Sequence, residues 1–100
     1  MEEIKEREKI IRLLDALFPG VKIYLFGSRA RGTNRPTSDI DIALDLGRKL
    51  TFLEIEGACN VLDTLYIPQK IDIVDMQTIP ASLKNIILKE GVAWKREICV

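Results

Sequence analysis

Residues Phe26 to Leu44 read FGSRARGTNRPTSDIDIAL and combine a small-residue turn with two closely spaced carboxylates. The turn follows an apolar run, and Asp39 and Asp41 occupy alternate positions of a second apolar run. Like charges on one face of a strand repel, and a strand that needed only burial would carry Val or Ile there. The pattern therefore predicts a positive species beside the two carboxylates.

The composition limits the possible classes of function. The chain has 100 residues, of which 47% are hydrophobic and 30% charged, and this suits a single domain over residues 1–100 with one modest core. Fifteen basic and fifteen acidic side chains give no net charge, which disfavours bulk nucleic-acid binding. No apolar run approaches the roughly 20 residues of a membrane span, and the charged start is unlike a signal sequence. We therefore expect a cytoplasmic protein.

The chain has no histidine and two cysteines, Cys59 and Cys99. The lack of histidine excludes a histidine-based triad and disfavours a conventional zinc site. The cysteine spacing suggests neither a metal site nor a disulfide framework. Any metal should therefore be a hard cation held by oxygen ligands.

Helical and strand patterns alternate along the chain. The interval between the first two strands is too short and too rich in proline and glycine for a crossover helix. We therefore expect an α+β fold with a small mixed β-sheet and helices mainly on one side. A capping box at Thr51 and Glu54 opens the second long helix, whose inward side chains should include Leu53. The expected helices are Glu3–Phe18, Thr51–Tyr66 and Pro80–Gly91, the expected strands are Val21–Phe26, Asp39–Leu46 and Lys70–Asp75, and the tail GVAWKREICV is an ambiguous edge strand.

Strand alternation predicts where the carboxylates point. Asp39 and Asp41 share one face of their strand, while the isoleucines beside them point to the core. The isoleucines of KIDIVD likewise take the buried positions, which leaves Asp72 on the open face and turns Asp75 away from it. Three converging carboxylates favour Mg²⁺, bound together with waters and substrate phosphates.

The turn supplies the second half of the predicted site. Gly27 ends the first strand where a side chain would block close approach, and Ser28 can cap the helical turn SRAR. Together they can offer a hydroxyl and backbone N–H groups to a triphosphate. Arginines at 29, 31 and 35 add positive charge, and Arg31 is the best phosphate ligand among them because Gly32 restricts its backbone position.

These residues resemble a known family. Gly27-Ser28, ten residues and then Asp39-Ile-Asp41 resemble the GS-x10-DxD signature of nucleotidyltransferases related to DNA polymerase beta, and Asp72 matches their third carboxylate. The string GSRARG with SDIDIAL is similar to the minimal nucleotidyltransferases of the MNT or MntA type, and the similarity covers nearly the whole chain.

The resemblance implies a nucleotidyltransferase fold and assigns roles to the site residues. Asp39 and Asp41 would bind two Mg²⁺ ions, and Asp72 would complete the ion nearer the attacking hydroxyl. Gly27-Ser28 would hold the β,γ-phosphates of ATP. Two such ions lower the pKa of an incoming hydroxyl and stabilise departing pyrophosphate, and they would neutralise the repulsion between the paired carboxylates.

The resemblance also implies a partner. MntA-type proteins are antitoxins that neutralise a HEPN-domain ribonuclease toxin by transferring AMP from ATP to a toxin tyrosine, within a hetero-oligomer. An alternative is a binding module that occludes the toxin sterically and uses its nucleotide site only as a structural or regulatory element. Adenylylation of an unrelated protein or small molecule is a third reading. The three intact carboxylates favour an enzyme, because a purely steric inhibitor needs no such cluster.

Overall fold

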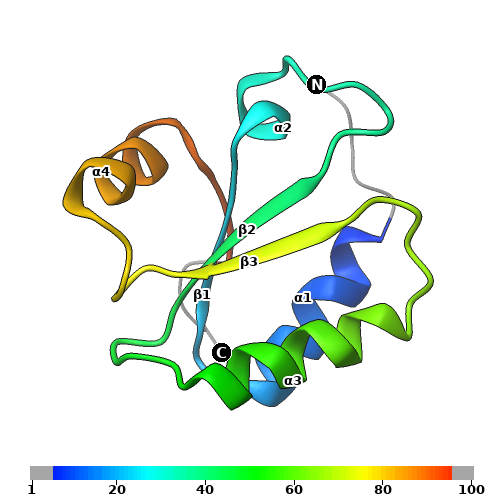
Figure 1. Ribbon diagram of the computed structural model, residues 1–100, viewed down its shortest axis with the longest axis vertical. Coiled ribbons are helices and arrows are strands. Elements are labelled where there is room, and N and C mark those ends of the chain that lie inside the picture. The colour runs from blue at the N-terminus through cyan, green and yellow to red at the C-terminus, as the bar shows by residue number, and fades with distance from the viewer. Residues whose placement is uncertain (1–5, 96–100) are drawn as a thin grey trace.

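The computed structural model describes residues 6–95, which form a four-stranded mixed sheet with helices on both faces (Figure 1). The strand order is β3-β2-β1-β4, with β1 antiparallel to β2 and β4, and β2 parallel to β3. This confirms the expected mixed α+β sheet, and the ambiguous tail supplies an edge strand. The elements in chain order are α1 (Arg7–Leu17), β1 (Lys22–Phe26), α2 (Ser28–Arg31), β2 (Ile40–Asp45), α3 (Phe52–Asp63), β3 (Ile71–Asp75), α4 (Ala81–Glu90) and β4 (Val92–Lys95).

The lengths of the connections explain the strand directions. The segment between β1 and β2 contains only the single turn α2 and an irregular loop, so β2 returns antiparallel to β1. The helix α3 crosses from β2 to β3 and allows that pair to be parallel. Residues 3–5 of the first expected helix, and Cys99, lie outside the described residues.

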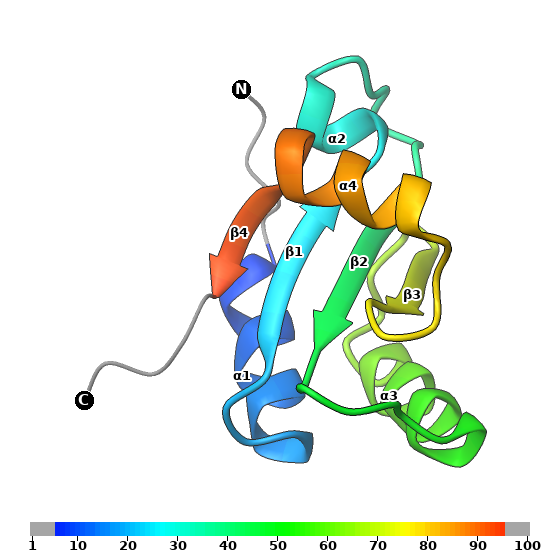
Figure 2. The same cartoon turned by 90° about the vertical axis from the view of Figure 1, so that its left-hand side faces the viewer.

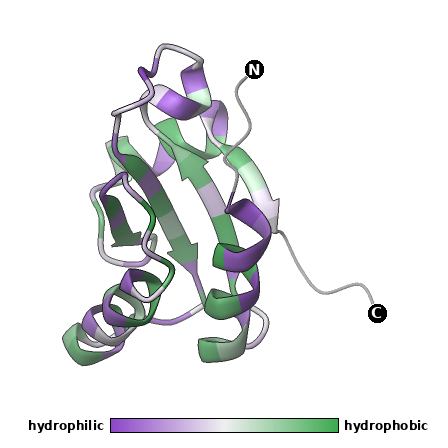
Figure 3. Cartoon of the chain, turned by 90° about the vertical axis from the view of Figure 1, so that its right-hand side faces the viewer, coloured by the Kyte–Doolittle hydropathy of each residue, from purple (hydrophilic) through white to green (hydrophobic). Residues whose placement is uncertain are grey.

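The larger core lies between the sheet and the two longest helices, α1 and α3 (Figure 3). Alternate residues of β1 and β2 point into it, as the strand pattern predicted. A smaller core on the opposite face joins Ala43, Met76 and Ile87 beneath α4 (Figure 2). The buried side chains of the larger core are Ile10, Leu14, Phe18, Val21, Ile23, Leu25, Ile40, Ile42, Leu44, Leu50, Ala58, Leu62 and Trp94.

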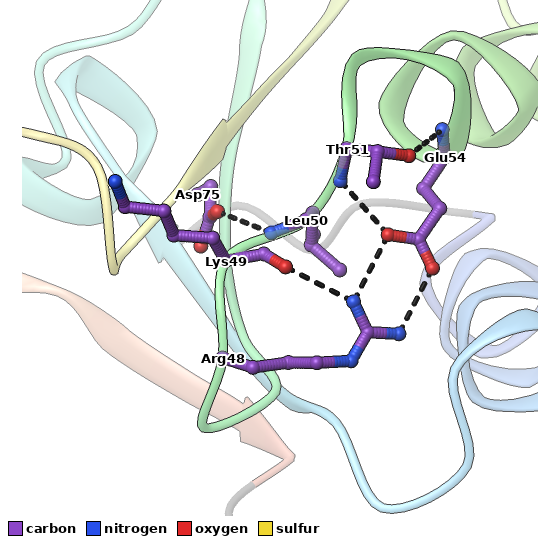
Figure 4. A network of polar contacts seen from close by, with 6 residues as sticks. All are labelled: Arg48, Lys49, Leu50, Thr51, Glu54 and Asp75. Carbon is purple, nitrogen blue, oxygen red and sulfur yellow. Dashed lines mark hydrogen bonds and ion pairs between the residues drawn. The ribbon is translucent and has the colours of Figure 1, made fainter.

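The helix α3 begins as predicted but differs in its end and in one inward residue. Thr51 Oγ1 accepts a hydrogen bond from Glu54 N at 3.1 Å, and a Glu54 carboxylate oxygen accepts one from Thr51 N at 2.8 Å, which confirms the capping box (Figure 4). The prediction that Leu53 points inward is wrong, because Leu53 is 73% exposed. The inward stripe starts at Ile55, two residues and therefore about 200° around the helix from Leu53. The helix ends at Asp63, before the expected Tyr66.

A buried carboxylate holds the segment that leads into α3. Asp75 is 2% exposed and accepts a hydrogen bond from Leu50 N at 2.7 Å (Figure 4). It accepts a second one from Gln77 N at 3.0 Å. It points to the face of the larger core, away from Asp72, as strand alternation predicted.

Within the described part of the chain, no helix is long and apolar enough to cross a membrane.

Candidate functional site

Three carboxylates lie at the end of the sheet where β2 and β3 begin. Asp41 is the direct neighbour of Asp72 across the parallel pair, so both side chains point to the same face. Asp39 lies immediately before β2, and its charge acts on Asp41. A hydrogen bond from Ile40 N to Lys70 O, at 2.8 Å, aligns the starts of the two strands. The structure therefore brings the three sequence-predicted carboxylates into one neighbourhood.

The turn after β1 reaches the same place. Figure 2 shows α2 at the end of the sheet where β1 finishes and β2 begins. Gly27 has φ +78° and ψ −154°, a conformation that is essentially restricted to glycine. A Cβ atom at this position would overlap Asp41 Oδ2 and would lie 3.3 Å from Asp41 Cγ. Glycine is therefore required here both by the backbone conformation and by the close approach of Asp41.

The prediction that Ser28 caps α2 is wrong. Gly27 occupies the N-cap position, and its carbonyl accepts hydrogen bonds from the N–H groups of Ala30 and Arg31 at 3.1 and 3.2 Å. Ser28 is the first residue of the helix and makes no side-chain capping bond. Its carbonyl accepts a hydrogen bond from Thr33 N at 2.9 Å, which closes the turn. Ser28 thus lies beside Gly27, but its hydroxyl is not used to start the helix.

The arginines of this region have different environments. Arg31 has a half-exposed side chain and lies 3.9 Å from Glu90 of α4, and its charge partly offsets the rise in the pKa of Asp41. Arg35 is exposed on the loop. Arg29 is buried, and its Nη2 donates to the carbonyls of the loop that precedes Asp39. The sequence does not reveal the burial of Arg29, since no local pattern in SRAR distinguishes a buried arginine from an exposed one.

The electrostatics of the site centre on Asp41. Its pKa is raised chiefly by burial and further by the charges of Asp72 and Asp39, while Arg31 opposes the rise. Within residues 6–95, the side chains of Asp39 and Asp41 make no hydrogen bond or ion pair. Asp72 Oδ1 lies 3.5 Å from Nζ of Lys70, a residue two positions earlier that shares the face of Asp72 by strand alternation. A cation placed among the carboxylates would relieve their mutual repulsion.

The three carboxylates are the type of ligand that binds a hard cation. All three side chains offer carboxylate oxygens, which are the ligands that Mg²⁺ prefers, and Mg²⁺ commonly needs only one or two of them alongside waters and phosphates. Among the residues described, no three acidic or cysteine side chains surround a common point closely enough to hold an ion as they stand. Holding an ion with all three carboxylates would therefore require side-chain movement.

Residues 8–95 match the family described as polymerase beta, nucleotidyltransferase. The chain belongs to this nucleotidyltransferase family. A relative from Haemophilus influenzae, "probable protein adenylyltransferase MntA", is 29% identical over 87% of this chain and 78% of its own. A relative from Methanocaldococcus jannaschii, named "putative protein adenylyltransferase", is 36% identical over 92% of this chain and 95% of its own.

Solved structures of nucleotidyltransferase antitoxins share the fold. A toxin–antitoxin crystal structure with AMP-PNP contains a chain that is 30% identical to this one, with a TM-score of 0.77 over 88% of this chain and 71% of that one. A second structure, of the tri-AMPylated Shewanella oneidensis HEPN toxin in complex with MNT antitoxin, gives 27% identity and a TM-score of 0.70 over 89% and 68%. The nucleotidyltransferase fold expected from the sequence is therefore confirmed.

Proposed function

We propose that this nucleotidyltransferase is an antitoxin that transfers AMP from ATP to a tyrosine of a HEPN-domain toxin. The observation that carries the proposal is the register that sets Asp41 beside Asp72, with Gly27 packed against Asp41. In this arrangement the glycine turn lies next to a carboxylate cluster in which the side chains of Asp39 and Asp41 make no ion pair within the described residues. The named relatives and the toxin-bound neighbours support the choice of reaction and partner.

Each site residue has a proposed role in the reaction. Asp39, Asp41 and Asp72 would hold two Mg²⁺ ions, which when bound supply the positive charge that activates a hydroxyl and stabilises pyrophosphate. Gly27 would let the β,γ-phosphates approach the backbone closely, and the Ser28 hydroxyl and N–H would donate to them. The tyrosine oxygen forms a bond to the α-phosphorus as the bond to the β-phosphate bridging oxygen breaks, and the phenolic proton passes to solvent.

Arg31 has a different part in the proposal. It is the last residue of α2, its charge acts on Asp41, and its half-exposed side chain lies near Glu90 of α4. A guanidinium there can pair with a phosphate oxygen of the nucleotide, in exchange for its long contact with Glu90. Arg31 is therefore the arginine proposed to bind phosphate, while the burial of Arg29 excludes it from direct contact with a nucleotide in this conformation.

One observation favours a second candidate, a steric antitoxin. Asp72 is paired with Lys70, and the carboxylates of the described residues do not enclose an ion as they stand. A protein that only occluded its toxin could keep such an arrangement. The two candidates differ in whether the toxin is chemically altered.

The test combines the purified chain with ATP labelled at the α-phosphate, Mg²⁺ and the HEPN-domain toxin proposed as its partner. Label on a toxin tyrosine, located by mass spectrometry of its peptides, is the expected result. The matched control is the Asp39→Asn, Asp41→Asn double variant, checked for folding by circular dichroism, which should transfer no label. Label on some other molecule would overturn the assigned acceptor, and the absence of any transfer by wild type would leave the steric antitoxin.

A further inference from the structure

Arg29 connects the Gly27-Ser28 turn to the backbone that carries Asp39. Its side chain starts on α2 and is 7% exposed, in contrast to the exposed Arg31 and Arg35. Its Nη2 donates to Ser38 O at 3.0 Å and to Pro36 O at 3.3 Å. Because Ser38 O belongs to the peptide group joined to Asp39, the guanidinium fixes the chain immediately before this carboxylate.

The same loop is held at further points. Arg35 N donates to Ser38 Oγ at 2.8 Å, and Ser38 N donates to Arg35 O at 3.0 Å, which makes a tight turn. Gln69, just before β3, donates to Pro36 O at 2.9 Å. The carbonyl of Pro36 therefore receives one side chain from α2 and one from the segment that leads to Asp72. The loop spans the two halves of the proposed site.

The burial of a guanidinium here needs a reason. Transferring a charged side chain out of water is costly, and carbonyls of a surface loop can be satisfied by water alone. A planar fork of N–H donors can, however, fix two carbonyls in one orientation, which water does not do. We infer that Arg29 is a positioning residue that sets the direction of Asp39 toward Asp41. The inference rests on the proposed function, in which Asp39 binds a metal ion.

Arg29→Lys is the most direct test, because lysine keeps the charge and most of the length but loses the fork. Two properties of the metal-free protein are measured: amide hydrogen exchange of residues 33–39, and binding of Mn²⁺ alone, followed by the EPR signal of the free ion. We expect faster exchange in this loop with unchanged exchange in α1 and α3. We also expect roughly tenfold weaker Mn²⁺ binding, the effect typical of losing a residue that orients a metal ligand.

Arg35→Lys is the matched control, since it makes the same chemical change at an exposed position of the same loop and should alter neither property. Arg29→Met is the second variant if lysine prevents folding, because an apolar side chain of similar length leaves no unpaired buried charge. It should give the same two effects.

The outcomes separate the inference from the proposed function. Unchanged loop exchange in a folded Arg29 variant would overturn the inference, and so would a loosened loop with wild-type Mn²⁺ affinity. If wild type itself bound no Mn²⁺, the proposed metal site would fail. Arg29 would then have no metal ligand to position, and the inference would be overturned with it, whereas a wild type that binds Mn²⁺ confines any failure to Arg29.

Discussion

Replacing Gly27 by alanine should damage the fold and the site together. With φ +78° and ψ −154°, Gly27 occupies a backbone region where any other residue costs about 1–3 kcal/mol. The added Cβ would also overlap Asp41 Oδ2 and approach Asp41 Cβ to 3.5 Å, so the carboxylate or the turn must move. We expect the free energy of unfolding to fall by at least ~1–3 kcal/mol, a large share of the ~5–15 kcal/mol typical of a domain.

Urea unfolding followed by the fluorescence of the single tryptophan, Trp94, measures the stability change. Calorimetric titration with a non-hydrolysable ATP analogue and Mg²⁺ measures nucleotide affinity, which should be lost. Gly47→Ala is the matched control: Gly47 also has positive φ, at +82°, but an added Cβ meets no atom within 4 Å. It should lose stability and keep nucleotide affinity. A Gly27→Ala protein with wild-type stability and affinity would refute the reasoning.

The other predictions concern three further carboxylate or backbone positions. Asp75→Asn should lower the free energy of unfolding by roughly 1.5–3 kcal/mol, because the amide nitrogen cannot accept one of the two hydrogen bonds from Leu50 N and Gln77 N. AMP transfer per folded molecule should stay unchanged, and an unaltered urea midpoint would contradict the prediction. Tyr66→Gly should raise the melting temperature, since Tyr66 is 90% exposed and has φ +54°, and a lower melting temperature would show that its side chain packs in solution. Asp41→Asn should stabilise the metal-free protein at neutral pH, because burial and the neighbouring carboxylates raise the pKa of Asp41 and folding therefore disfavours its ionised form. The difference in melting temperature between variant and wild type should vanish below the ordinary pKa of 3.8, and a pH-independent difference would contradict an ionisation penalty at Asp41.

The face on which each site carboxylate lies could be predicted from the sequence, because β2 and β3 both show the two-residue alternation of a half-buried strand. In β2 and β3, isoleucines at every second position must face the core, so the intervening aspartates are forced onto the other face. The strand parity of Asp41, Asp72 and Asp75 was therefore predictable from local pattern. The parallel pairing that makes Asp41 and Asp72 direct neighbours also depends on the crossover helix α3, whose start the capping box at Thr51 predicts.

The features that could not be predicted depend on tertiary contacts or on one dihedral angle. Whether Arg29 is buried is decided by loop carbonyls seven and nine residues away, with no local signature. Serine is a residue type favoured at helix N-caps, yet in this structure Gly27 occupies the N-cap and Ser28 is the first residue of the helix. Leu53 is apolar and lies in the first turn of α3, but the helical phase set by Ile55 carries it to the solvent side.

The most direct test of the proposed function is the state of the toxin after it has been separated from this chain. The HEPN-domain partner is coexpressed with wild type or with the Asp39→Asn, Asp41→Asn double variant, purified away under conditions that break the complex, and examined by intact mass and ribonuclease assay. With wild type, we predict a toxin that is heavier by one or more AMP units and stays inactive when free. With the double variant, which should still bind, we predict unmodified mass and restored ribonuclease activity. A toxin that left wild type at unchanged mass and recovered its activity would contradict AMP transfer as the function of this chain.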